Sequence, residues 1–562
     1  MRFLTVRRSL IILPACLCLA LGLSACAAAK AAPTQATAPL PTPAAPVAQA
    51  NTPQPAQSMP DPTPAISLLG LPDDLPQALK DSLKLPQGWK TTAGDAPASV
   101  KLDLSPASSA AGASGQVDWI YALAAPFPTV PDEISLSDLQ TAWKDSPPAS
   151  SPFHALLVDA STQAIFSQLW GAPSSAVKVL PAAQLVEDAW AEKTAWAILP
   201  FEQLEPRWKV IRVDGQSPVQ KSFTPDTYGL TVHFSLQGSE AQVAALLADG
   251  PIAQANRRAD RLTTVMVTGT TALVRGTASF MEGRGIDYPA QFIGDTLRSA
   301  DILHVSNEIS FAKNCPPPFD WMDLKFCSRE KYFQLLQDVG VKVVELTGDH
   351  LDDWGKDAFL NTLQMYQNAG MKYYGGGVNI EEARQPALLE HNGNKIAFIG
   401  CNAKEPGYGK ASETYPGTWH CDMERMAASI KDLRARGYLP IATFQHIEYY
   451  SYEAKPVLQQ DFRQMADAGA VIVSGSQAHQ PQAMELRGDA FLHYGLGNLF
   501  FDQTNQGDPP RTAFIDRHIF YDGKYIGAEL LTIYLVDYAR SRPMTQPERE
   551  KLLTAIFQAS GW

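Results

Sequence analysis

Side chains that can bind a metal ion or move a proton follow a series of apolar, strand-like runs in the second half of the chain. His479 lies just after the run at 470–473, and a later run ends at His493 and leads to Asn498. The other polar groups that follow such runs are Asn307, Glu308, Asp349, His350, Asp353, His446, Glu448 and Gln477. Because α/β folds keep their chemistry on the loops after strands, these residues form one candidate site.

Three histidines that directly follow strand-like runs, His350, His446 and His479, indicate metal chemistry. Eight of the ten histidines lie between His304 and His518. Imidazole nitrogen and carboxylate oxygen together suit Mn, Fe or Zn. An ion of this kind polarises a phosphoryl oxygen and lowers the pKa of a bound water. We expect one shared polar site in preference to three separate structural histidines, and whether that site is catalytic stays open.

The elements that must position these residues alternate between strand and helix from residue 260 onward. Apolar runs predict strands at 264–268, 302–305, 341–346, 439–444 and 470–473. Helical spacing predicts helices at 288–298, 329–339, 357–369, 422–436 and 459–468. Asn392-Gly393 is expected to join strands at 387–391 and 395–400 as a hairpin. This order fits an α/β/β/α sandwich.

The motifs of this region resemble, in order, those of the capsule-synthesis (CapA, poly-γ-glutamate capsule) family, a branch of the calcineurin-like metallophosphatase superfamily. The segments that carry the resemblance are Asn307-Glu308, Gly348-Asp349-His350, Asp353-Trp354-Gly355, His446 with Glu448, Gly475 to His479, and Gly495 to Phe500. The resemblance implies the metallophosphatase-like sandwich for residues 260–562. It also implies a protein that acts on a cell-surface polymer or its precursor, or assists its assembly.

The same resemblance implies a role for each residue of the candidate site. The residues expected to hold one divalent ion (Mn, Fe or Zn) are Glu308, Asp349, His446 and His479. Those expected to act in catalysis are Glu448 and His350, the latter as a general acid or a substrate-orienting group. Those expected to line the site are Asn307, Asp353, Gln477 and Asn498.

Two departures from the family pattern, at Thr270 and Gln477, argue against a pair of metal ions. The family opens with Gly-Asp, whereas the first strand here ends at Gly269-Thr270, and Gln477 replaces one histidine of a His-x-His pair. We therefore expect at most one tightly held ion and weak or absent phosphodiesterase activity. Residues with a structural alternative are Asp353 as a helix cap, His493 as a core histidine and Asn498 as a turn residue.

The first 65 residues are typical of an exported lipoprotein. Residues 1–26 combine a basic start, an apolar stretch too short to span a bilayer and the lipobox Leu23-Ser24-Ala25-Cys26. Acylation of Cys26 would anchor the protein to a membrane outside the cytoplasm, and an ordinary cleaved signal is the alternative. Residues 27–65 are rich in Ala and Pro and predict a disordered tether.

Residues 66–255 predict a separate α/β domain whose pattern resembles a periplasmic-binding-protein-like module. Strands are expected at 117–124, 155–158, 177–180, 195–199 and 210–213. Helices are expected at 136–143, 162–170 and 183–190, with Ser135 capping the first. The tryptophans of this region favour core positions over a ligand cleft, and nothing here specifies a ligand.

Four cysteines remain after the signal and Cys26. An even number in an exported chain predicts disulfides, and of three connectivities the sequential one, Cys315 with Cys327 and Cys401 with Cys421, is favoured. A four-thiolate zinc site is the alternative, but no Cys-x-x-Cys pair is present.

Charge restricts the partners of the chain. The net charge is −12 with a pI near 5.4, which argues against nucleic acid as a partner.

The signal, the motifs and the family resemblance together lead to the main hypothesis. It is an extracytoplasmic, lipid-anchored protein of cell-surface polymer synthesis with a metallophosphatase-like site. The alternative is a non-catalytic ligand-binding or scaffold lipoprotein of the cell envelope.

Overall fold

The computed structural model describes residues 66–93, 96–105, 115–248, 254–318, 324–404 and 409–562. The predicted signal, tether and lipid-bearing Cys26 all lie outside these ranges. Among the helices in the described ranges, none has the length and apolar character needed to cross a membrane.

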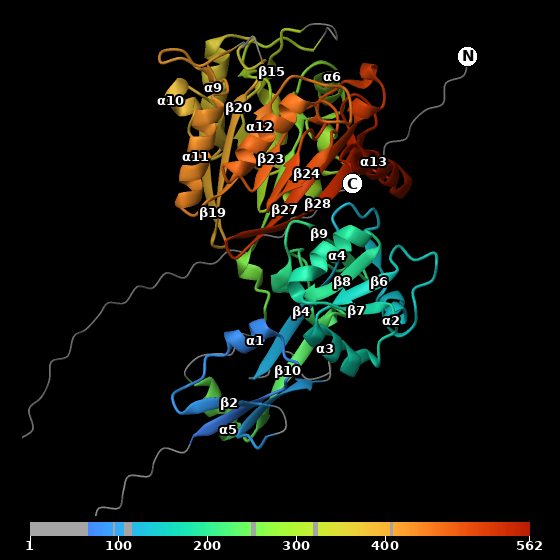
Figure 1. Ribbon diagram of the computed structural model, residues 1–562. Coiled ribbons are helices and arrows are strands. Elements are labelled where there is room, and N and C mark those ends of the chain that lie inside the picture. Colours follow the sequence, from blue (N-terminus) through green and yellow to red (C-terminus); the bar gives the residue numbers. More distant parts are fainter. Residues whose placement is uncertain (1–65, 94–95, 106–114, 249–253, 319–323, 405–408) are drawn as a thin grey trace, which may run out of the picture. The chain divides into compact units, whose positions relative to one another are not determined.

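The first part of the described chain builds a ten-stranded mixed sheet with helices packed on it (Figure 1). The strand order is β2-β1-β3-β10-β4-β8-β6-β7, with β9 on β4 and β5 on β9. The strands are β1 (Ser67–Leu71), β2 (Trp89–Ala93), β3 (Val100–Ser105), β4 (Gln116–Pro126), β5 (Glu133–Ile134), β6 (Ala155–Val158), β7 (Val177–Val179), β8 (Ala195–Pro200), β9 (Trp208–Val213) and β10 (Thr231–Gly238). The α-helices are α1 (Gln77–Ser82), α2 (Leu136–Lys144), α3 (Ala160–Trp170), α4 (Leu185–Glu192) and α5 (Glu240–Leu247).

These elements confirm the α/β class predicted for the first part. Each predicted strand and helix is present, and the Ser135 side chain accepts a hydrogen bond from the Asp138 backbone N–H at the start of α2. Trp119, Trp143 and Trp196 are buried in the core, as expected. Strands β1, β2, β3, β5 and β10 were not predicted, because their apolar residues are few or are interrupted by polar and small ones.

The second part contains two large sheets. A nine-stranded sheet has the order β17-β16-β13-β11-β27-β28-β29, with β12 beside β13 and β26 beside β12. A six-stranded sheet has the order β19-β20-β22-β23-β25-β24. The strands of the first are β11 (Leu262–Thr268), β12 (Thr270–Thr271), β13 (Ile302–Asn307), β16 (Val341–Glu345), β17 (Lys372–Tyr374), β26 (Asn498–Phe500), β27 (Thr512–Tyr521), β28 (Lys524–Leu535) and β29 (Ser541–Pro543). Those of the second are β19 (Ala387–His391), β20 (Asn394–Asn402), β22 (Leu439–Gln445), β23 (Ile472–Ser474), β24 (Met484–Arg487) and β25 (Ala490–His493).

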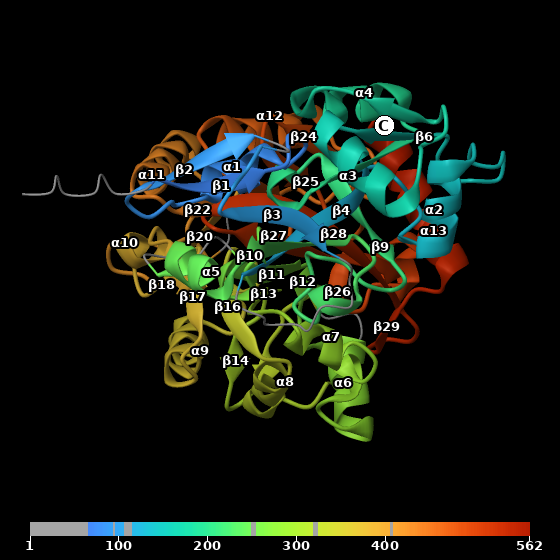
Figure 2. The ribbon, with the colours of Figure 1, turned by 90° about the horizontal axis from the view of Figure 1, so that it is seen from below.

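Helices cover the outer face of each sheet, which confirms the predicted α/β/β/α sandwich. Figure 2 shows α11 and α12 on one side and α6, α8 and α9 on the other, with the strands between. The helices of this part are α6 (Arg275–Arg284), α7 (Gly294–Arg298), α8 (Phe333–Asp338), α9 (Lys356–Asn368), α10 (Ile380–Ala383), α11 (Met423–Ala435), α12 (Pro456–Asp467) and α13 (Gln546–Ala559). The helix predicted at 288–298 is divided into a 3-10 turn, Tyr288–Ala290, and α7.

Three apolar cores hold the four layers together. Phe333 and Leu363 lie in the core between the first sheet and its helices. Val267 and Phe398 lie in the core between the two sheets, and Ile430 packs in the core under α11 and α12. Burial of apolar area on this scale is the main force that fixes the sheets face to face.

The parallel strands of both sheets begin at one edge of the sandwich and end at the other. Strands β11, β13 and β16 are parallel neighbours, as are β20, β22 and β23. At the starting edge the Asn392 side chain donates to the Leu262 carbonyl at 2.7 Å. The loops after all six strands therefore meet at the opposite edge, where the predicted site residues lie.

Both predicted disulfides are present. Cys315 is bonded to Cys327 and Cys401 to Cys421, with sequence separations of 12 and 20. Since all four sulfurs are in disulfide bonds, the four-thiolate zinc site is ruled out.

Candidate metal centre

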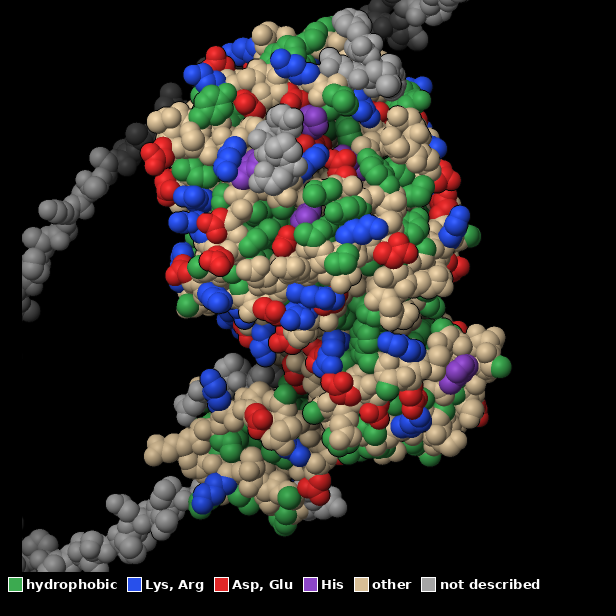
Figure 3. Space-filling model, turned by 45° about the horizontal axis from the view of Figure 1, so that its top comes forward, with side chains coloured by type: hydrophobic (Ala, Val, Ile, Leu, Met, Phe, Trp, Pro, Cys, Tyr) green, Lys and Arg blue, Asp and Glu red, His purple; other side chains and the backbone are tan. Residues whose placement is uncertain are grey.

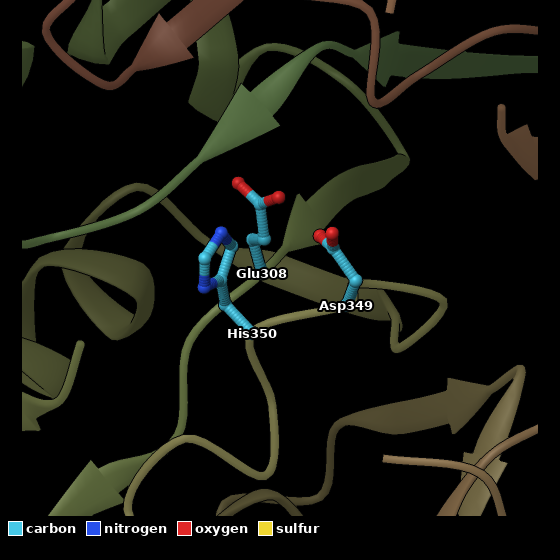
Figure 4. Close-up of side chains that lie close together, drawn as sticks. All are labelled: Glu308, Asp349 and His350. Atoms are coloured by element: carbon cyan, nitrogen blue, oxygen red, sulfur yellow. The ribbon is translucent and has the colours of Figure 1, made fainter. Parts of the chain in front are cut away.

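Glu308, Asp349 and His350 lie together on the loops that follow β13 and β16 (Figure 4). Their ligand atoms all lie within 4.8 Å of one another, and the three side chains point toward the same space. The two loops come this close because residue 348 is glycine. A Cβ there would lie 2.8 Å from the Glu308 Cα, which is too close for any other residue.

One amide group holds both carboxylates of the cluster. Gln445 Nε2 donates to Asp349 Oδ1 at 2.7 Å and to Glu308 Oε1 at 3.2 Å. The Asn402 Nδ2 group donates to Gln445 Oε1 at 2.9 Å, so the orientation of the Gln445 amide is fixed. The carboxyl ends of β20 and β22, which carry Asn402 and Gln445, thus support ligands that belong to the other sheet.

His350 is oriented by a carboxylate from its own loop. Its Nδ1 atom lies 2.7 Å from Asp353 Oδ2, which also accepts a hydrogen bond from the Phe326 backbone N–H. The other ring nitrogen, Nε2, is then free to face Glu308 and Asp349. Histidines that bind metal commonly have one ring nitrogen held by a carboxylate in this way. The alternative that Asp353 caps a helix is wrong, because α9 starts at Lys356 with Gly355 in the cap position.

A second group of charged residues adjoins the cluster. Lys404 Nζ lies 2.7 Å from Asp349 Oδ2 and 2.8 Å from Glu448 Oε1. The same Glu448 oxygen is 3.8 Å from His479 Nε2. The chain of contacts therefore runs from Asp349 through Lys404 to Glu448 and His479, so His479 is separated from Glu308 by these residues.

The tautomer of His479 follows from its neighbour Asn498. Asn498 Nδ2 donates to the His479 and Pro510 carbonyl oxygens, at 3.1 and 3.0 Å, so its Oδ1 is left as an acceptor. This oxygen lies 2.9 Å from His479 Nδ1, which must donate. In the neutral ring, Nε2 then carries a lone pair on the side of Glu448.

His446 is not brought into the cluster. Its Nε2 lies 3.0 Å from Asp461 Oδ2 on α12, and its Nδ1 accepts a hydrogen bond from the Ile447 backbone N–H at 2.9 Å. Both ring nitrogens are thus engaged away from the cluster, whereas Glu308 and Asp349 contact Gln445 at the strand-end edge of the sandwich.

The remaining predicted residues are buried around the cluster. Asn307 donates to the Tyr366 hydroxyl at 2.7 Å, and its Oδ1 has no protein partner among the described residues. Neither polar atom of the Gln477 side chain has such a partner, and the same holds for the Thr270 hydroxyl. These two positions supply neutral groups where the family pattern has an aspartate and a histidine.

The cluster shifts the pKa of its own members. Burial, together with the charges of Asp349 and Glu448, raises the pKa of Glu308 to about 8. Burial alone would raise the pKa of Asp349, but the positive charges of His350 and Lys404 lower it to about 2. Burial opposes a charge on His350, but its bond with Asp353 and the nearby carboxylates raise its pKa to about 9. A bound cation would favour loss of the Glu308 and His350 protons.

The residues that sequence reasoning missed are Lys404, Gln445 and Asn402. Their positions carried a signal, because Asn402 and Gln445 end strands β20 and β22 and Lys404 lies two residues after the end of β20. None of the three belongs to the segments that carried the family resemblance.

The donor set fits a borderline divalent cation. Two carboxylates and one imidazole, whose far nitrogen is held by Asp353, are ligands that suit Mn, Fe or Zn. On the face shown in Figure 3, histidine side chains lie beside acidic and basic ones. The fold and the cluster together define a metallophosphatase-like α/β/β/α protein with its polar centre at the ends of the parallel strands.

Comparison with known proteins supports this classification. Residues 264–503 match the family described as "Bacterial capsule synthesis protein PGA_cap", which confirms the family resemblance over that segment. The chain is 22% identical to "Capsule biosynthesis protein CapA" of Bacillus anthracis, over 48% of this chain and 67% of that protein. It is 22% identical to "PGA biosynthesis protein CapA" of Bacillus subtilis, over 47% of this chain and 70% of that protein.

Solved structures are less similar. A 5'-nucleotidase precursor from Thermus thermophilus has a TM-score of 0.31 at 12% identity, over 53% of this chain and 58% of that chain. A phosphate transport receptor from Vibrio cholerae has a TM-score of 0.25 at 11% identity, over 32% of this chain and 92% of that chain. Likenesses at this level bear on neither ligand nor reaction.

Proposed function

We propose that this chain is a cell-envelope protein of surface-polymer synthesis that performs hydrolysis with one bound divalent metal ion. The observation that carries the proposal is the convergence of Glu308, Asp349 and His350 within 4.8 Å. The match of residues 264–503 to a capsule-synthesis family supports the polymer as the process served.

Each residue of the cluster has a distinct task in this proposal. Glu308 and Asp349 bind the ion through carboxylate oxygen and His350 through Nε2, while Gln445 and Asp353 keep these ligands in place. When bound, the ion polarises a substrate oxygen and generates a nucleophilic water at neutral pH. Glu448, which lies beside His479 Nε2, is placed to accept a proton from a water molecule and pass it to that nitrogen.

Metal content tests the cluster directly. Purified protein exposed to Mn, Fe or Zn and then desalted should retain one ion per chain, and Glu308→Gln or Asp349→Asn should lose it. The matched control is Glu381→Gln, an exposed carboxylate on α10 that pairs with Arg384. Wild-type protein without metal, or metal unchanged in both cluster variants, would contradict the proposal.

Hydrolysis is tested with the simple phosphodiester bis(4-nitrophenyl) phosphate. Slow turnover that requires added metal and disappears in Glu308→Gln supports the reaction. A second candidate function, non-catalytic ligand binding, is favoured by the neutral groups at Thr270 and Gln477. Stoichiometric metal without turnover of any phosphodiester or polymer substrate would decide for this candidate.

Localisation forms a separate part of the proposal. We propose that Cys26 carries lipid and that the chain is held at a membrane outside the cytoplasm. Cell fractions should then release the wild-type protein only with detergent, and Cys26→Ala should be soluble without it. Equal behaviour of the two proteins would argue for an ordinary cleaved signal.

A further inference from the structure

Among the residues that the structure describes, Lys404 is the lysine that contacts carboxylates of the candidate metal centre. It lies two residues after the end of β20 at Asn402, and its backbone N–H donates to Asn402 Oδ1 at 2.8 Å. The side chain then extends between two carboxylates from different loops, at 2.7 Å from Asp349 and 2.8 Å from Glu448. The ammonium group is partly buried, with 30% of the side chain exposed.

The position of the ammonium group is the one a second cation would need. In a two-ion centre one carboxylate bridges both ions. Here Asp349 Oδ1 accepts from the Gln445 amide that also donates to Glu308, while Asp349 Oδ2 contacts Lys404. Beyond Lys404 lie Glu448 and, 3.8 Å further on, His479 Nε2 with its lone pair. Asp349, Glu448 and His479 thus offer two carboxylates and one imidazole around the ammonium group. Glu308, Asp349 and His350 offer the same set of groups to the first ion.

Charge balance also favours one divalent ion over two in this centre. In the metal-bound state His350 must be neutral to act as a ligand. With Glu308, Asp349 and Glu448 ionised, the ammonium group of Lys404 then leaves two negative charges in the centre. One divalent ion neutralises them, whereas a second would leave an excess of two positive charges in a partly buried site. Like charges at such short distances repel strongly where water is limited.

We propose that Lys404 is a built-in cation that occupies the second ion position, so that the centre accepts one divalent ion and loss of this lysine opens a second position between Asp349, Glu448 and His479. The inference rests on the proposed function, because it assumes that the Glu308 side binds the first ion. Lys404 also gives the centre a positive charge that is covalently fixed beside the first ion position. A second metal ion could dissociate, so its charge would not be permanent.

The test compares metal stoichiometry and affinity in wild-type protein and Lys404 variants. Isothermal titration with Mn²⁺ and elemental analysis should give one ion for wild-type protein and two for Lys404→Met and Lys404→Gln. Lys404→Arg retains the charge and should still bind one. Lys431→Met, at an exposed position on α11, is the matched control and should also bind one. Circular dichroism and thermal melting establish that each variant is folded.

The outcomes separate this inference from the proposed function. One ion of unchanged affinity in both neutral Lys404 variants would overturn the role of Lys404 and leave the single-ion proposal standing. Two ions in wild-type protein would also overturn it. No ion in wild-type protein but binding in Lys404→Met would support the built-in cation while contradicting a resident metal, and no ion in any variant would contradict both.

Discussion

Two regions of the sandwich each contain a histidine bound to an aspartate, and they differ in what the second ring nitrogen faces. At the strand-end edge, His350 Nδ1 lies 2.7 Å from Asp353, and Nε2 faces the carboxylates of Glu308 and Asp349. Between the sheets, His493 Nδ1 lies 2.6 Å from Asp516. There Nε2 has no hydrogen-bond partner among the described residues.

The second pair joins the two sheets, because His493 belongs to β25 and Asp516 to β27. Both side chains are almost fully buried, and the His493 ring lies 5.1 Å from that of Phe514. This agrees with the expectation that His493 is a core residue. The same two residue types thus serve cohesion in one place and ligand orientation in the other. The surroundings decide which, since only the edge pair adjoins carboxylates that a cation can bridge.

The largest expected effect concerns the core pair. Asp516→Ala leaves the buried His493 nitrogen without its partner and should lower the free energy of unfolding by about 3 kcal/mol. Asp353→Ala, at a pair that is about one-quarter exposed, should cost far less. Urea denaturation followed by circular dichroism measures both, and equal losses would remove the distinction between the two regions.

The next effect concerns the edge pair and metal affinity. Asp353→Ala frees His350 from its fixed orientation, so Mn²⁺ affinity should fall by about 10- to 100-fold. Any Asp516 variant that remains folded should bind Mn²⁺ as the wild type does. Isothermal titration measures these affinities, and a loss of the same size in the Asp516 variant would show that the core pair also supports the centre.

A smaller effect should appear in the pH dependence of the metal-free protein. The pKa of Glu308 is raised to about 8 in the folded state, well above its value in an unfolded chain. Between about pH 4.5 and 8 the folded state keeps a proton that the unfolded chain has released, so stability falls as pH rises. His350, whose pKa is raised to about 9, adds a fall of the same sign between about pH 6.5 and 9.

Glu308→Gln should therefore remove a slope of up to about 1.4 kcal/mol per pH unit in the lower part of that range. The measurement is the free energy of unfolding of chelator-treated protein at several pH values from 5 to 8. An identical slope in wild-type and variant protein would assign the pH dependence to other groups.

The smallest effect is expected for His446. Its ring binds Asp461 and the Ile447 backbone, so His446→Ala should leave metal content unchanged, while His350→Ala should abolish stoichiometric binding. Elemental analysis of the two variants separates the ligand set predicted from sequence from the one that the structure brings together. Metal loss in His446→Ala would return this histidine to the ligand set.

Much of the fold could be predicted because apolar runs and turn signals are local. Strands β13, β16 and β22 were found from their apolar runs, and the hairpin at Asn392-Gly393 from its turn residues. The long hairpin of β27 and β28 was missed although Asp522-Gly523 carries the same signal, with φ of 48° and 76°. That β27 lies beside β11 in the middle of a sheet depends on contacts between residues far apart in the chain.

The sequence by itself determined which residues follow strands, and hence which polar groups could gather at one edge of the sandwich. It also favoured, among three connectivities, the cysteine pairing that the structure contains. Only the tertiary structure decided that His350 faces the carboxylates while His446 faces α12, and that Lys404 lies between Asp349 and Glu448. The physical reason is that a side chain's direction and its charge partners are set by the packing of loops from two different sheets, and no local spacing encodes them.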